Sequence, residues 1–183
     1  MRITGASSLR NVAFAVGTSL HTHGISAVLT GGACASLHSE GAYTSLDLDF
    51  VLTGMVTQAR LDQAMAAVGF TRMGDRYHHP ECDFWVEFPR GPLAVGADYK
   101  IRPTTLQGSA GQVRVLSPTD SCRDRLAAFY HWNDRQSLEV AIQIARRHPV
   151  DLSAIRRWSR REGADEKLRI FVNRLETGRA RRS

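Results

Sequence analysis

The sequence has few cysteines and no long apolar run. Cys34, Cys82 and Cys122 are three scattered thiols, and an odd, unpaired set argues for reduced cysteines in a cytoplasmic protein. The apolar runs are far too short to span a membrane, so we expect no membrane partner. Polar residues interrupt the apolar stretch near the N-terminus, which predicts an amphipathic helix over residues 8–21 and not a signal peptide.

Several catalytic signatures are also missing. There is no Gly-x-Ser-x-Gly nucleophile motif and no Gly-x-x-x-x-Gly-Lys phosphate loop. Residues 78–83, HHPECD, contain ligand types for zinc, but a structural zinc site needs four well-placed ligands, usually in two spaced pairs. One crowded segment of this kind favours a polar loop over a zinc site.

Lysine is nearly absent, and the positive charge is concentrated near the C-terminus. The 183 residues carry a net charge of +6 and are 43% hydrophobic, which suits one domain, or one domain with a small appendage. Residues 151–183 contain nine arginines, one lysine and five acidic residues, whereas the first 150 residues carry only +1. Arginine suits bidentate phosphate recognition, although a GC-rich coding bias would produce the same composition.

The pattern of apolar residues divides the chain into two parts. Up to residue 116 it predicts a mixed α/β (α+β) core with helices over 8–21, 31–38 and 58–68, strands over 25–30, 46–52, 70–73 and 83–88, and a hairpin of 99–106 with 112–116. Ser117-Pro118-Thr119-Asp120 is a typical helix start, with a serine cap and proline in the first turn. Residues 117–183 are therefore predicted to be helical, over 118–131, 134–147, 150–161 and 165–177.

Asp47 and Asp49 are the first candidate site residues. They lie two apart on a predicted strand, so both carboxylates share one face while Leu48 and Phe50 point into the core. Like charges about 6 to 7 Å apart repel each other unless a cation lies between them, and Mg²⁺ prefers such oxygen ligands together with substrate phosphates. An Asp-x-Asp pair can equally be the solvated face of an edge strand.

The segment before the aspartates adds groups that suit a phosphate. Gly31 and Gly32 end a strand and open a helix whose first amide groups can face an anion. Thr44 and Ser45 place hydroxyls just before the two aspartates. None of these features is specific alone, but the order of strand, Gly-Gly, short helix, hydroxyl turn and Asp-x-Asp is.

This order resembles the nucleotidyltransferase superfamily related to DNA polymerase β. TGGACASLH followed by YTSLDLDF is similar to the bacterial abortive-infection nucleotidyltransferase toxin families. The resemblance implies a minimal nucleotidyltransferase sheet with flanking helices, and transfer of a nucleoside monophosphate from a nucleoside triphosphate with Mg²⁺ or Mn²⁺. It also implies an acceptor hydroxyl on a tRNA-like RNA or on a protein, and a cognate antitoxin as partner in a toxin–antitoxin or phage-defence system.

The resemblance also assigns roles to the residues of the motif. Asp47 and Asp49 would hold one or two metal ions, and a third carboxylate would come from a neighbouring strand. The candidates are Asp83 and Glu87. We favour Glu87, because it lies in an apolar setting where an unpaired carboxylate would be costly. It would ligate a metal and accept the proton of the acceptor hydroxyl.

The nucleotide itself would be held by backbone and hydroxyl groups. Gly31 and Gly32 would bring backbone amides near the phosphates, and Ser45 would contact the β- or γ-phosphate. The later stretch SPTDSCRDRLAAFYHWNDRQSLEVA is similar to the helical element in which a basic residue and a later aspartate help hold the site. Arg125 and Asp134 are the matching candidates.

These last assignments have ordinary alternatives. The basic residue is often lysine in these families, and arginine here suits phosphate binding better than proton donation. Asp134 can equally be the N-cap of the next helix.

Two alternative functions remain open at this point. A degenerate nucleotidyltransferase fold could serve as a binding module or an antitoxin-like partner without catalysis. A plain RNA-binding protein could use the arginines of residues 156–161, which lie one helical turn apart around Trp158. The alternative for this segment is a solvated basic face with Trp158 packed inward.

Overall fold

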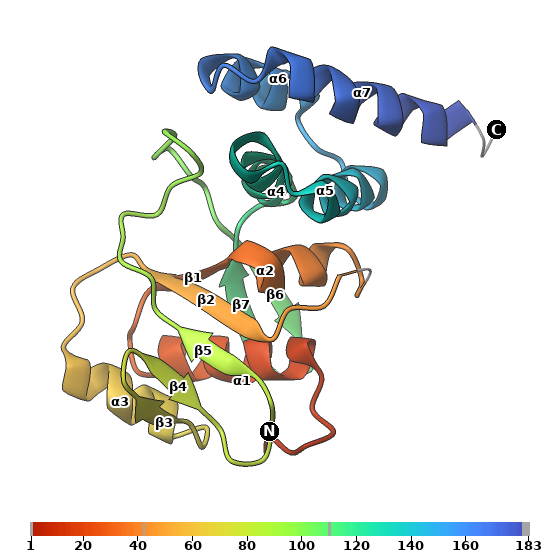
Figure 1. The fold of residues 1–183 in the computed structure, drawn as a ribbon. Coiled ribbons are helices and arrows are strands. Elements are labelled where there is room, and N and C mark those ends of the chain that lie inside the picture. The colour runs from red at the N-terminus through yellow and green to blue at the C-terminus, as the bar shows by residue number, and fades with distance from the viewer. Residues whose placement is uncertain (1, 42, 110, 181–183) are drawn as a thin grey trace.

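A computed structural model describes residues 2–41, 43–109 and 111–180 (Figure 1). In the described residues, no helix is both long and apolar enough to cross a membrane. The elements in chain order are α1 (Leu9–Thr22), β1 (Ala27–Thr30), α2 (Gly31–His38), β2 (Asp47–Leu52), α3 (Gln58–Ala66), β3 (Thr71–Met73), β4 (Arg76–His78), β5 (Trp85–Glu87), β6 (Thr104–Gly108), β7 (Gly111–Val115), α4 (Pro118–Trp132), α5 (Arg135–Arg147), α6 (Leu152–Arg161) and α7 (Asp165–Ala180).

The strands form one mixed sheet in the order β3-β4-β5-β2-β1-β7-β6. The β2–β5 and β1–β7 pairs are parallel, and the other pairs are antiparallel. Helix α1 packs on β1 and β7, whereas α2 packs on β1 and β2 and is covered in turn by α4 and α5 (Figure 1). The predicted mixed sheet with flanking helices and a C-terminal helical part is confirmed.

Local sequence signals explain where several helices begin. The Ser8 hydroxyl accepts a hydrogen bond from Asn11 N, and Ser117 Oγ accepts one from Asp120 N at 3.1 Å, with Pro118 in the first turn of α4. Each cap satisfies an amide that has no partner inside the helix. The helix start predicted at residues 117–120 is therefore confirmed.

One strand escaped prediction from sequence. Residues 74–78 were expected to be turn and loop, but β3 and β4 form a tight hairpin in which Met73 pairs with Arg76. Gly74 adopts a φ of +68° in the connecting turn, a conformation that glycine reaches without steric cost. The strand predicted from residue 83 begins only at Trp85, so Asp83 lies in an exposed bend outside the sheet.

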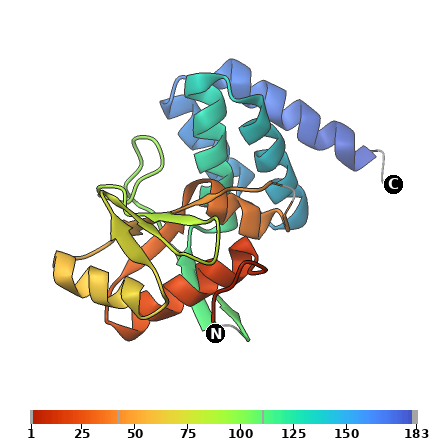
Figure 2. The same cartoon turned by 60° about the horizontal axis from the view of Figure 1, so that its bottom comes forward.

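The helical part is joined to the sheet part through the segment of residues 88–103, which follows β5. Asp98 accepts a charged hydrogen bond from the buried Arg123 of α4 at 2.6 Å. The indole of Trp158 on α6 donates to Val95 O at 3.2 Å. The buried apolar residues of both parts form one continuous cluster. The helices of the C-terminal part lie together to one side of the sheet (Figure 1 and Figure 2).

Arg123 is the arginine on which this junction depends most. Its side chain is 6% exposed and pairs with both Asp98 and Asp120. We expect Arg123→Leu to lower the free energy of unfolding by about 3 kcal/mol, because it leaves the buried carboxylate of Asp120 without its cationic partner. Arg157→Leu, on the exposed face of α6, should change it by less than about 0.5 kcal/mol. Urea denaturation measures both, and equal effects would contradict this role of Arg123.

Candidate functional site

Four residues from four neighbouring strands form a row across the sheet. Thr30 on β1 pairs with Asp49 on β2, and Asp49 pairs in parallel register with Glu87 on β5. Glu87 in turn pairs with Arg76 on β4. Asp47 lies two residues before Asp49, so its carboxylate shares this face of the sheet. The structure thus brings Asp47, Asp49 and Glu87 to adjacent positions on one face.

The electrostatics of Asp49 reflect this crowding. Burial and the negative charges of Glu87, Asp47 and Asp124 raise the pKa of Asp49 to about 6, and the positive charge of Arg125 only partly opposes them. A carboxylate in such surroundings has more negative than positive charge around it. A bound cation would relieve the imbalance.

Arg76 is the site neighbour that sequence reasoning missed. Its guanidinium lies 3.4 Å from Glu87 Oε1 and 4.8 Å from the centre of the Trp85 ring. It was missed because its strand was expected to be a loop. The alternation of Arg76, buried Tyr77 and His78 directly after a Gly-Asp turn was the available signal.

The two glycines allow the backbone to approach the carboxylates closely. Gly31 has a φ of +62°, and a Cβ atom placed there would lie 2.6 Å from Asp49 Oδ2. A Cβ at Gly32 would lie 2.8 Å from Tyr43 Cε1 and 3.1 Å from Ser45 Oγ. Only residues without a side chain fit between the start of α2 and these groups.

The start of α2 is therefore next to Asp49. Its N-cap residue Thr30 makes no capping hydrogen bond with its side chain and instead donates from Oγ1 to Asp49 O at 3.2 Å. The first amides of a helix lack intrahelical partners and carry the positive end of its dipole. Ser45 Oγ donates to Asp47 O at 2.9 Å, so this hydroxyl supports the strand that carries the aspartates.

Helix α4 supplies a charged pair above the strand. Arg125 donates from Nε and from one terminal nitrogen to Asp124 Oδ2, at 3.1 and 2.7 Å, and both side chains are half-buried. Both charges act on the pKa of Asp49. Asp124 is not among the residues expected from the sequence, because the side chain that a helix presents to the sheet depends on tertiary packing.

Asp134 has a clear structural role. It accepts hydrogen bonds from Gln136 N at 2.9 Å and Ser137 N at 3.1 Å, as the N-cap of α5. Its hydrogen bond from the Ser137 hydroxyl is the main cause of its lowered pKa, and the charge of Arg125 contributes. The N-cap interpretation is confirmed, and a role in the site stays a prediction.

The carboxylates fit a metal ion that arrives together with phosphates. Among the side chains that the structure describes, no three His, Cys, Asp or Glu residues already form a metal-binding group. Mg²⁺ commonly uses one or two protein carboxylates, with substrate phosphates and water completing its coordination. Asp47 and Asp49, with Glu87 beside them, match that donor set. Asp83 lies outside the row, so the register favours Glu87 as the third carboxylate.

Solved structures with the same arrangement of elements decide the fold. A nucleotidyltransferase-like protein from Paracoccidioides brasiliensis matches with a TM-score of 0.55 and 17% identity, over 77% of each chain. ANT(2″)-Ia, solved with adenylyl-2″-tobramycin, matches with a TM-score of 0.51 and 12% identity, over 91% of this chain and 97% of its own. The chain has a nucleotidyltransferase fold.

Sequence comparison adds nothing finer to this result. No protein-family model matches the chain, and a search of curated proteins finds no significant match. The nucleotidyltransferase fold agrees with the broader resemblance found in the sequence motif. The closer resemblance to abortive-infection toxins stays a prediction.

Gly31 offers a test of whether the site depends on close backbone approach. Gly31→Ala and Gly74→Ala both place a side chain at positive φ, but only the first meets another group, the carboxylate of Asp49. Both should lose about 1 kcal/mol of stability. Only Gly31→Ala should also weaken Mg²⁺-dependent nucleotide binding, by at least about tenfold. Isothermal titration with each nucleoside triphosphate checks this, and equal binding by the two variants would contradict it.

Asp49 should destabilise the metal-free protein when it is ionised. Its folded pKa of about 6 exceeds the ordinary value of 3.8, so the folded form binds this proton more tightly than the unfolded form. Its contribution to stability therefore falls as pH rises from about 4 through 6. This difference of about two in the pKa of Asp49 corresponds to about 2.7 kcal/mol of folding free energy. Partial exposure of the carboxylate reduces the effect to roughly 1–2 kcal/mol.

We accordingly expect Asp49→Asn to be more stable than wild type by that amount at pH 8 in EDTA, with the gain shrinking toward pH 4. Urea unfolding at several pH values measures it. Asp75→Asn, in the exposed turn between β3 and β4, is the control that should show no such gain. An Asp49→Asn protein no more stable than wild type at pH 8 would contradict the crowding of the carboxylates.

Proposed function

We propose that this protein is a metal-dependent nucleotidyltransferase that moves a nucleoside monophosphate from a nucleoside triphosphate to a hydroxyl group. The observation that supports this most is the row in which Asp49 and Glu87 pair on adjacent strands, with Asp47 on the same face and the start of α2 against Asp49. Its occurrence in a nucleotidyltransferase fold gives the carboxylates a chemical context.

The residues divide the reaction between them. Asp47, Asp49 and Glu87 would hold Mg²⁺ or Mn²⁺, which when bound neutralises charge on the triphosphate. The amides of Gly31 and Gly32 approach the phosphates from the start of α2. The acceptor oxygen forms a bond to the α-phosphorus, pyrophosphate leaves, and Glu87 accepts the proton of the acceptor hydroxyl.

Further groups around the carboxylates orient the nucleotide in this proposal. Ser45, now bonded to Asp47 O, is placed to contact the β- or γ-phosphate. Arg125 lies near Asp49 and is already oriented by Asp124, so its charge is directed toward the same region. Arg76 has the same sign of charge on the far side of Glu87.

The charge of the helical part favours an RNA acceptor. Residues 151–183 carry a net charge of +5, which opposes a polycation such as the tobramycin adduct bound by ANT(2″)-Ia. Trp158 is buried, while the arginines of α6 are exposed. Arg156, Arg160 and Arg169 line a hollow of about 410 Å³ between α6 and α7. A tRNA-like RNA would bring phosphates to such a surface.

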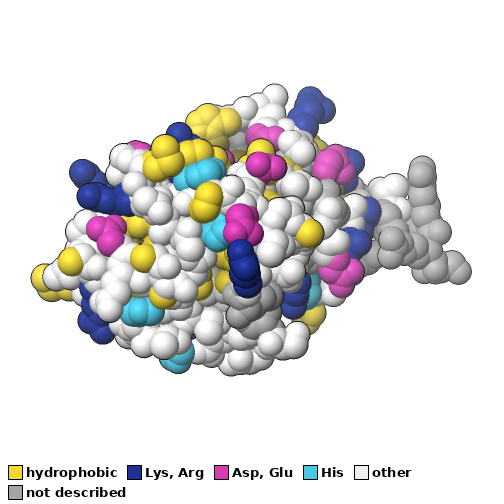
Figure 3. All heavy atoms as spheres, turned by 90° about the horizontal axis from the view of Figure 1, so that it is seen from below, with side chains coloured by type: hydrophobic (Ala, Val, Ile, Leu, Met, Phe, Trp, Pro, Cys, Tyr) yellow, Lys and Arg dark blue, Asp and Glu magenta, His cyan; other side chains and the backbone are white. Residues whose placement is uncertain are grey.

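The face of the sheet part that Figure 3 shows differs from this arginine-rich surface. On the face of the sheet part seen in Figure 3, basic and acidic side chains are interspersed with apolar ones. A toxin role in a toxin–antitoxin or phage-defence system, with an antitoxin as partner, is proposed on the sequence motif alone.

A catalytically degenerate binding module is the second candidate. It is favoured by the ion pair that already engages Glu87 with Arg76, and by the lack of a preassembled three-ligand metal group among the described side chains. Such a protein would bind nucleotide or a protein partner without transferring a phosphate.

Transfer of label separates the two candidates. Each α-³²P-labelled nucleoside triphosphate is incubated with Mg²⁺ and wild-type protein, with total RNA, total protein or tobramycin as acceptor. We expect labelled RNA, and a loss of at least about 100-fold in Asp47→Ala/Asp49→Ala and in Glu87→Ala. Asp83→Ala should keep activity, because Asp83 lies outside the row.

Other outcomes would change the conclusion in defined ways. Labelled protein or tobramycin would keep the transferase and replace its acceptor. If Asp83→Ala lost activity and Glu87→Ala did not, Asp83 would replace Glu87 as the third carboxylate. Absence of transfer with every triphosphate, together with Mg²⁺-independent nucleotide binding, would leave the binding module.

A further inference from the structure

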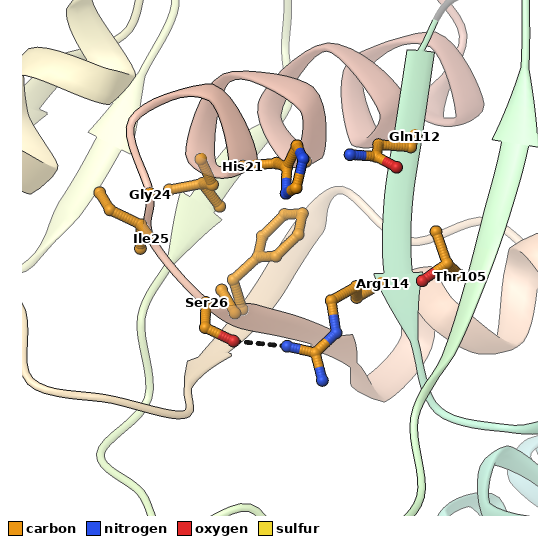
Figure 4. Close-up of a pocket in the computed structure, with 11 residues that line it drawn as sticks. His21, Gly24, Ile25, Ser26, Thr105, Gln112 and Arg114 are labelled. Atoms are coloured by element: carbon orange, nitrogen blue, oxygen red, sulfur yellow. Dashed lines mark hydrogen bonds between the residues drawn. The ribbon is translucent and has the colours of Figure 1, made fainter.

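A second cavity, separate from the carboxylate row, lies at the end of the sheet where β1 begins. It has a volume of about 410 Å³ and is lined by the last turns of α1, residues 24–27, β2, β6 and β7 (Figure 4). His21 from α1, Ser26 from the segment before β1, and Gln112 and Arg114 from β7 point into it, as Figure 4 shows. None of the residues assigned above to nucleotide transfer lines this cavity.

The cavity forms where the first residues of β7 extend beyond the first residue of its neighbour β1. The parallel pairing of β1 with β7 is registered at Leu29 and Val115, so the first residues of β7 extend past the start of β1. The backbone of Gln112 is satisfied by the Thr18 hydroxyl, which accepts from Gln112 N at 2.9 Å and donates to Gln112 O at 3.2 Å. Beyond the start of β1, helix α1 therefore takes the place of a neighbouring strand for β7, and the hollow lies between α1 and β7.

The polar groups of the cavity are mainly hydrogen-bond donors. The Arg114 guanidinium donates to Ser26 Oγ, and among the described residues it has no carboxylate partner. The amide oxygen of Gln112 already accepts a hydrogen bond from Gln107 at 3.0 Å, which leaves the Gln112 NH₂ group to donate. His21 stands at the exposed rim. Among the residues that the structure describes, no acidic side chain lines the cavity.

The remaining wall is apolar. Leu20, Ile25 and Phe50 are buried and line the same cavity. A donor-rich side opposite an apolar side suits a ligand with an acceptor group at one end and a ring or chain at the other. An arginine without a carboxylate partner is the group that binds phosphate or carboxylate in a bidentate manner.

We propose that this cavity binds a small aromatic anion, whose phosphate or carboxylate group is held by Arg114 and Gln112 and whose ring packs against Phe50 and Leu20. Thr105 pairs with Arg114 across β6 and β7 and supplies a further hydroxyl at the anionic end. The site is distinct from the carboxylate row, because none of the residues proposed for the transfer reaction lines this cavity.

The position of Phe50 gives such a ligand a route to the carboxylates. Phe50 follows Asp49 on β2, and successive side chains of a strand point to opposite faces of the sheet. A ring bound against Phe50 therefore contacts the residue next to Asp49 from behind. Occupancy of the cavity would act on the carboxylate row through the backbone of β2.

Nuclear magnetic resonance titration of the ¹⁵N-labelled protein tests the proposal directly. The probes are phenyl phosphate and benzoate, with phenol as the neutral ring. We expect one or both anions to shift the amide signals of Gly24, Ser26, Gln112 and Arg114 before those of Gly31 and Gly32, and phenol to bind at least about tenfold more weakly. Phenyl phosphate without benzoate would identify a phosphate ligand, and the reverse a carboxylate.

Variants at Arg114 provide the matched comparison. Arg114→Gln should weaken anion binding about tenfold or more, because it removes a charge-assisted hydrogen bond. Arg114→Lys retains the charge, so its affinity for the anion should fall between those of wild type and Arg114→Gln. It replaces Arg114→Gln as the test if the glutamine variant proves unstable. Arg157→Gln removes an exposed arginine elsewhere and should bind like wild type. Shifts that appear only around Gly31, or binding unchanged in both Arg114 variants, would overturn the proposal.

Discussion

Repulsion between Asp49 and the carboxylates around it is the constraint on which the site depends. Glu87 is its register partner on β5, Asp47 shares its face of β2, and Asp124 approaches from α4. The fold keeps these charges together although burial and the neighbouring carboxylates raise the pKa of Asp49. Gly31 contributes because, without a side chain, its backbone can lie close to the carboxylate of Asp49. The arrangement costs stability in the absence of a cation, and that cost is the physical argument for a metal-dependent function.

The helical part takes part in the site and is not an independent appendage. The segment of residues 88–103 leaves β5 just after Glu87 and is fixed to α4 and α6 by Asp98 and Val95. Arg123 anchors that segment through Asp98, and Arg125 lies on the same helix. The contact that holds the segment of residues 88–103 therefore also helps to orient α4. The charged pair of Asp124 and Arg125 is thus positioned by a junction whose arginine, Arg123, directly precedes it on α4.

Much of this could be read from the sequence because it is local. A few consecutive residues are enough to predict the Asp-x-Asp strand, the glycine pair and the capped start of α4. β4 is harder to predict, because the alternation in a three-residue strand with one buried side chain, Tyr77, is too short to stand out from a loop, and Arg76 was missed with it. The pairing of Asp98 with Arg123 and the approach of Asp124 to Asp49 are set by tertiary packing, which leaves no pattern in the neighbouring sequence.

The alternation of β2 also protects the assembly of the site during folding. A shift of the strand by one residue would turn Leu48 and Phe50 to the carboxylate face and bury Asp47 and Asp49 in the core. Such a misregistered chain would lose apolar contacts and bury two charges at once, so it cannot compete with the native pairing. A molecule that completes its core in this register has consequently also placed Asp47 and Asp49 together on the opposite face of the sheet.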